Sequence, residues 1–64
     1  MIAVTKEVFD DVLSRCAGIA EPETETDVEF SYETHFGPDG EEIAVASYRG
    51  GQAVGWMVAE HTIK

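Results

Sequence analysis

Residues 24–36 read TETDVEFSYETHF and carry the clearest secondary-structure pattern of the chain. Apolar or threonine side chains fill the even positions of this stretch, whereas the odd positions are acidic, serine or histidine. A period of two is typical of a β-strand with one buried and one solvent-facing side. The stretch therefore predicts one long strand over about 24–36, with a row of carboxylates on its solvent side.

The residues before this stretch predict a helix over about 5–17. Thr5 is a suitable N-cap, and Arg15 lies in the last turn, where the helix dipole favours a positive charge. Apolar residues recur at helical spacing and form one face, namely Val8, Phe9, Val12, Leu13 and Cys16. This amphipathic face has to be buried against the predicted strand and its neighbours.

The residues after this stretch predict two more strands, over about 41–49 and 52–61. Residues 37–40, GPDG, form a turn signal, and Gly50-Gly51 matches a two-residue hairpin connection. The sequence therefore predicts a single α+β domain over residues 1–64. Its order is α-β-β-β, with one N-terminal helix packed on a three-stranded antiparallel meander.

The side of the sheet that the helix covers depends on register. If Arg49 and Gln52 close the second hairpin, the large apolar residues of the last two strands share one face with the apolar positions of residues 24–36. The predicted sheet core is then Val28, Phe30, Tyr32, Ile43, Val45, Trp56 and Val58. A bulge at Gly40 would invert this parity and remains an alternative.

The charge is strongly uneven along the chain. Asp and Glu number 13 against 4 Lys and Arg, which gives a formal net charge of −9. Residues 21–42 hold nine of these acids and no base. This balance argues against direct binding to nucleic acid or to an anionic membrane surface. General solubility and protection of a sheet edge are alternative reasons for such acids.

The inventory for catalysis or cofactor binding is thin, so we expect no enzyme and no cofactor. Ser14, Ser31 and Ser47 lack the setting of a nucleophile. His35 stands opposite Glu42 in the expected register, with His61 near the same end of the sheet, which leaves a zinc site open as an alternative. The lone Cys16 is expected in the core, and a reducing cytoplasm suits a chain with one cysteine.

What remains is an interaction surface. In the expected register, the carboxylates border a flat floor of small residues, among them Ala44 and Ala46, on which Tyr48 and Met57 stand. Fixed charges steer a partner, while aromatic and methionine side chains supply buried contact. The predicted partner-binding residues are Glu23, Glu25, Asp27, Glu29, Glu33, Glu41, Glu42, Tyr48 and Met57.

In its size, its predicted α-β-β-β order and the acidic run EPETETDVE at residues 21–29, the chain resembles the small acidic anti-CRISPR proteins of phages. The nearest likeness is to inhibitors of type I Cascade, in particular of type I-C. The resemblance implies a non-enzymatic DNA mimic in the host cytoplasm that blocks target DNA at the large Cascade subunit, and a monomer is expected. The alternative is an acidic or antitoxin-like domain that neutralises a basic protein, with a homodimer left open.

Overall fold

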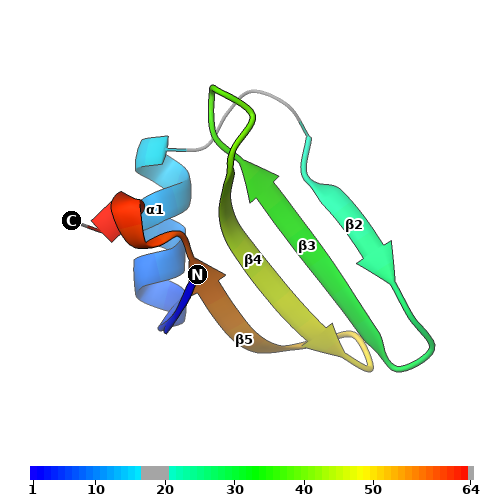
Figure 1. The fold of residues 1–64 in the computed structure, drawn as a ribbon. Coiled ribbons are helices and arrows are strands. Elements are labelled where there is room, and N and C mark those ends of the chain that lie inside the picture. Colours follow the sequence, from blue (N-terminus) through cyan, green and yellow to red (C-terminus); the bar gives the residue numbers. More distant parts are fainter. Residues whose placement is uncertain (17–20, 64) are drawn as a thin grey trace.

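The computed structural model describes residues 1–16 and 21–63. Within them, one α-helix packs on a five-stranded antiparallel sheet with the order β1-β5-β4-β3-β2 (Figure 1). The elements are β1 (Ile2–Val4), α1 (Lys6–Cys16), β2 (Glu23–Thr26), β3 (Phe30–Phe36), β4 (Glu42–Arg49), β5 (Gln52–Val58) and the short 3₁₀-helix η1 (Glu60–Ile63). The expected fold of one helix on three strands is therefore wrong, because β1 and β2 extend the sheet at its two edges.

The helix α1 forms where its sequence pattern predicts it. The hydroxyl oxygen of Thr5 accepts a hydrogen bond from the Val8 N–H at 3.3 Å, as an N-cap does. Phe9 and Val12 are its buried residues, and they face the sheet. The predicted last residue of the helix, at position 17, lies outside the described residues.

The Thr5 cap gives a first stability prediction. Replacing Thr5 with alanine removes the acceptor for the Val8 N–H and is expected to lower the free energy of unfolding by about 0.5–2 kcal/mol. Thermal melts followed by circular dichroism measure this loss. Thr5→Ser keeps a hydroxyl acceptor and is expected to melt close to the parent. Equal losses in both variants would show that the hydroxyl is not the stabilising group.

The first strand, β1, has no periodic signal in the sequence because it is only three residues long. It pairs with β5, where Ile2 stands opposite Val58 and Val4 opposite Trp56. Ile2 and Val4 are partly buried against the core. The pairing therefore covers the edge of β5 that the predicted meander leaves open.

The predicted long strand over 24–36 is divided in two by a tight turn. The Asp27 N–H donates to the Phe30 carbonyl at 2.6 Å, and the Asp27 carboxylate accepts a hydrogen bond from the Val28 N–H at 2.7 Å. The chain reverses here, and β2 pairs with β3, so that Glu25 stands opposite Tyr32. The turn contains no Gly or Pro, and the alternation of apolar and polar residues continues through it. The sequence therefore contains no sign of a turn here.

The hairpin of β4 and β5 begins in the predicted register and then departs from it. Arg49 pairs with Gln52 and Tyr48 with Ala53, as expected. A bulge follows at Val54, and beyond it Ala46 stands opposite Trp56 and Ala44 opposite Val58. Because one extra residue exchanges the two faces of a strand, Trp56 and Val58 change sides relative to β4.

On β3 and β4 the core consequently forms on the face that was expected to be open, while the predicted core residues Ile43, Trp56 and Val58 are confirmed in it or against it. Its buried residues are Phe9, Val12, Ile43, Ala44, Ala46 and Val58, with Val8, Leu13, Cys16 and Trp56 partly buried against it. Ala44 and Ala46 are small, which leaves room for the helix side chains above them. The predicted core members on β3 and its turn were wrong: Val28 is 97% exposed, Tyr32 40% and Phe30 36%. Val45 is also wrong, since it faces away from the helix opposite Met57.

The hairpin of β3 and β4 differs from its predicted register at one end. Phe36 stands opposite Glu42 and His35 opposite Ala44, with a bulge between these pairs. The expected pairing of His35 with Glu42 is therefore wrong. Beyond the bulge, Tyr32 pairs with Ser47 and Thr34 with Val45, so β3 and β4 keep the parity that the sequence predicted.

The last strand ends at Val58, earlier than the predicted residue 61. The chain turns into η1, where Thr62 is 6% exposed. The Arg15 guanidinium donates to the Thr62 carbonyl at 3.2 Å, and the Asp11 carboxylate accepts from Arg15 at 2.8 Å. This link fastens η1 to the end of α1, on the β5 side of the sheet and away from β2 (Figure 1).

Candidate protein-binding surface

The hairpin of β2 and β3 carries part of the predicted acidic row beyond the helix-covered core. Every residue of β2 is exposed. The helix α1 packs on β4 and β5, towards the other edge of the sheet. Glu23 and Glu25 stand opposite Thr34 and Tyr32, so they belong to the sheet face that α1 leaves open. We call the face of the sheet that α1 does not cover the open face.

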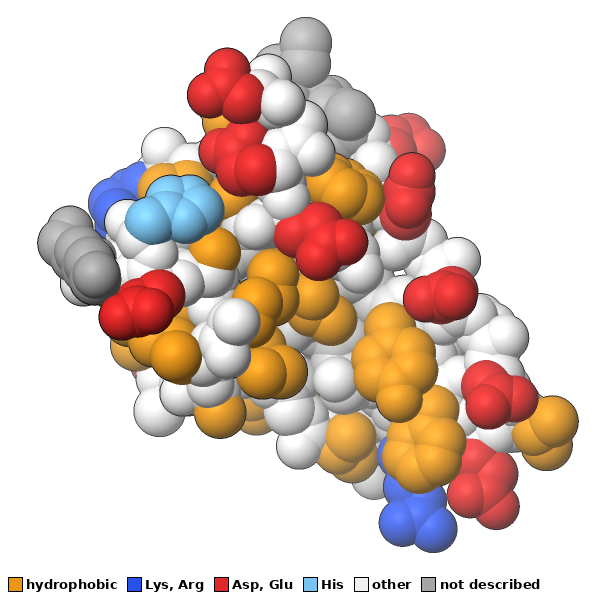
Figure 2. Space-filling model, viewed as in Figure 1, with side chains coloured by type: hydrophobic (Ala, Val, Ile, Leu, Met, Phe, Trp, Pro, Cys, Tyr) orange, Lys and Arg blue, Asp and Glu red, His pale blue; other side chains and the backbone are white. Residues whose placement is uncertain are grey.

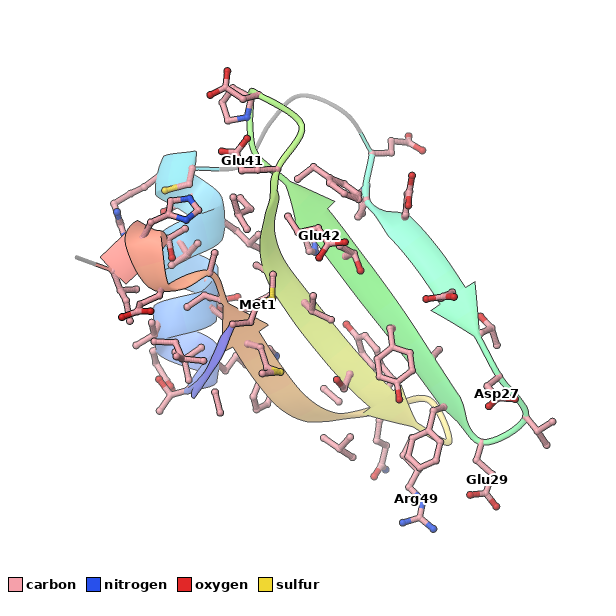
Figure 3. All side chains as sticks on the ribbon, viewed as in Figure 1. Met1, Asp27, Glu29, Glu41, Glu42 and Arg49 are labelled. Carbon is pink, nitrogen blue, oxygen red and sulfur yellow. The ribbon has the colours of Figure 1, made fainter. Side chains whose placement is uncertain are left out.

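The turn between β2 and β3 adds two more carboxylates at the tip of the hairpin. Asp27 and Glu29 both lie there, at the end of the sheet where Arg49 also lies (Figure 3). Acidic side chains follow the β2 side of the molecule in the space-filling view (Figure 2). Four of the predicted carboxylates, Glu23, Glu25, Asp27 and Glu29, are therefore brought together on one strand and its turn.

Glu33 does not belong to this row. It pairs with Thr24 and Ala46, which places it on the helix side of the sheet. Its carboxylate lies 2.7 Å from the His35 ring, and that ring meets Phe9 edge-on, with 5.7 Å between ring centroids. The expected single face of odd-numbered acids is thus wrong at Glu33, because the chain reverses between Glu25 and Glu33.

Glu41 and Glu42 lie at the other end of the sheet, around the turn between β3 and β4 (Figure 3). Glu42 is exposed, whereas Glu41 is half-buried and its Oε2 atom is buried without a hydrogen-bond partner. Glu41 and Glu42 therefore lie at the opposite end of β3 from Asp27 and Glu29, while Glu23 and Glu25 lie between these two ends along β2.

Tyr48 and Met57 lie on opposite faces of the sheet, which corrects the prediction that they share one floor. Tyr48 packs against the core cluster on the helix side. Met57 stands opposite Val45 on the open face and is 37% exposed. Ala44 and Ala46, expected on the open floor, are buried.

Apart from Met57, the apolar surface of the open face comes from residues that the sequence assigned to the core. Phe30 and Tyr32 on β3 share this face with Val45 and Met57. The Arg49 guanidinium lies over the Phe30 ring, 5.8 Å from its centroid, as in a cation–π contact. Hydrophobic side chains cross the middle of the view and meet acidic ones towards β2 (Figure 2). The predicted register between β3 and β4 correctly placed Phe30, Tyr32 and Val45 on one face of the sheet. It did not show which of the two faces α1 covers.

The described residues do not support the alternative of a zinc site. Within residues 1–16 and 21–63, no group of three or more His, Cys, Asp or Glu side chains is placed to hold a metal ion. In the same part of the chain, no helix has both the length and the apolar character needed to cross a membrane.

Both basic residues of α1 bind acidic side chains of the same helix. Lys6 donates to Asp10 at 3.0 Å, and this hydrogen bond, with the charge of the carboxylate, raises the pKa of Lys6. Arg15 is held by Asp11 and by the Thr62 carbonyl. The negative charge of the β2–β3 hairpin is therefore not offset by these two cations.

Comparison with protein-family models, curated protein sequences and solved structures gives no significant match. The function therefore has to be argued from the residues of this chain.

Proposed function

We propose that this protein is a non-enzymatic inhibitor that occupies the DNA-binding groove of a basic protein, with its carboxylates in place of phosphates. The observation that carries the proposal is the segregation of charge. Residues 21–42 hold nine acids and no base, and four of these acids lie on the β2 strand and its turn, away from the helix. On the resemblance given above, the first partner to test is the large subunit of type I-C Cascade in the host cytoplasm.

The spacing of the carboxylates supports binding in a groove lined by lysine and arginine. Side chains two residues apart on a strand, such as Glu23 and Glu25, recur every ~6.6 Å along one face. One strand of duplex DNA carries a phosphate about every 3.4 Å of helix axis. The row is thus a sparse copy of one phosphate strand, which suits charge-steered association with a groove built for DNA.

A second candidate function is that of an acidic or antitoxin-like domain that neutralises a basic partner without competing for DNA. The exposed apolar residues Phe30, Tyr32 and Met57 on the open face favour it, because such residues supply contact that does not depend on charge. The two candidates differ in how salt affects binding and in whether DNA competes.

A competition assay tests the proposal. Purified type I-C Cascade is mixed with labelled target duplex and increasing amounts of the protein, and bound DNA is measured. We expect the protein to displace the duplex, and its affinity for Cascade to fall steeply, by at least ~10-fold, between about 50 and 200 mM salt. Binding that resists salt and leaves the duplex bound would favour the second candidate. No binding to Cascade at either salt concentration would contradict this choice of partner.

A further inference from the structure

A shallow hollow of about 320 Å³ lies on the β2 side of the open face, lined by Glu25, Thr26, Asp27 and Tyr32. Glu25 stands directly opposite Tyr32 across the two strands, and the Tyr32 side chain is exposed. The Asp27 carboxylate is oriented by the hydrogen bond that its Oδ1 accepts from the Val28 N–H. The hollow therefore combines an aromatic ring with two carboxylates on a turn and a strand that are hydrogen-bonded to β3.

This combination fits a guanidinium group. A planar guanidinium stacks on an aromatic face and donates paired hydrogen bonds to carboxylates, which a compact ammonium group does less well. Its aliphatic stem can lie along apolar surface, which Phe30 provides on the same face of β3. The chemistry of the hollow thus selects arginine among the protein side chains.

The charges of the chain decide where that arginine comes from. A second copy would bring a further net charge of −9. Its Lys6 and Arg15 are already held by Asp10 and Asp11, and its Arg49 lies over Phe30. A basic partner, by contrast, has arginines that match the acidic β2 side.

We propose that the hollow beside Tyr32 is the docking site for an arginine side chain of the basic partner. This inference rests on the proposed function and adds the side chain that is recognised. Glu25 and Asp27 bind the guanidinium, and the Tyr32 ring stacks on it. The rest of the open face, with Val45 and Met57, then covers the apolar surface around that arginine.

Binding of a small probe tests the site without any partner. The protein, labelled with ¹⁵N, is titrated with a tripeptide that has arginine between two glycines and blocked ends, and amide shifts are recorded. We expect saturable shifts concentrated at Thr26, Asp27 and Tyr32. Shifts of equal size around Glu41 and Glu42, or no saturable shift at the hollow, would overturn the proposal. An equal response to the matching lysine peptide would overturn the assignment to arginine.

Variants of Tyr32 then test the site in the complex. Tyr32→Leu is expected to weaken Cascade binding by roughly 3- to 30-fold, because the aromatic face is lost, while Tyr32→Phe keeps it and binds as the parent does. Val28→Ala, at a fully exposed turn position, is the matched control and is expected to change nothing. If Tyr32→Leu inhibits at full strength, the arginine site is wrong and the proposed function stands. If the peptide binds at the hollow but the protein never displaces DNA, the proposed function is wrong and the site stands.

Discussion

Replacing Ile43 with alanine is expected to lower the free energy of unfolding by about 2–5 kcal/mol. Ile43 is 1% exposed and is among the largest fully buried side chains of the described residues. Its removal would leave a cavity beside Phe9 and Val12, which belong to the same cluster. Since small domains have little stability to lose, the variant is expected to be largely unfolded near body temperature.

The matched control for Ile43→Ala is Phe30→Ala, measured in the same urea and thermal melts. The sequence pattern assigned both residues to the core, but in the structure Phe30 is 36% exposed and contacts Arg49. We expect Phe30→Ala to cost no more than about 1 kcal/mol, chiefly from the lost cation–π contact. If Phe30→Ala were as damaging as Ile43→Ala, the helix would have to cover the other face of the sheet.

Reversing the charge of Glu23 and Glu25 together, by Glu23→Lys with Glu25→Lys, is expected to slow association with the partner by at least ~10-fold and to flatten its salt dependence. Both residues are exposed on β2 and share the open face, so the fold should be retained. Surface plasmon resonance at two salt concentrations measures the rates, and circular dichroism checks the fold. Asp27 is less suitable for this test, since its carboxylate also holds the turn through Val28.

The control for this pair is Glu7→Lys with Asp10→Lys, which changes the net charge by the same amount on α1. Asp10 is preferred to Asp11, because Asp11 holds Arg15, which in turn binds the Thr62 carbonyl. The exposed Lys6–Asp10 pair that is lost contributes little to stability. Equal weakening by both double variants would mean that only total charge matters, and the mimicry proposal would fail. If neither variant weakens binding, the acids serve solubility and the apolar open face becomes the binding surface.

Much of the local structure could be predicted because its signals are local. Thr5 and the apolar stripe through Phe9 and Val12 predicted the helix, and the structure confirms it over Lys6–Cys16. Gly50 and Gly51 have φ angles of +58° and +83°, which is why a glycine pair marked the second hairpin correctly. The concentration of acids in residues 21–42 is likewise a property of the sequence alone.

The candidate site was predicted less well than the fold elements. Glu23 and Glu25 were placed correctly on a solvent-facing strand side, whereas Glu33 and Tyr48 proved to lie on the helix side. Phe30 and Tyr32 were missed as surface residues, because an aromatic residue in an alternating strand is normally evidence of burial. The pattern could not reveal that α1 packs on β4 and β5 from the face opposite to Phe30 and Tyr32.

The helix, the two glycine-marked strand connections and the location of the negative charge follow from the sequence, since each depends on neighbouring residues. The tertiary structure alone decided which face is buried. A bulge at Val54 and a reversal after Asp27 each set the register between two neighbouring strands, and neither carries a residue type that demands it. Because the side chains of a strand alternate, a shift of one residue exchanges its two faces, and the same apolar residues become either core or surface.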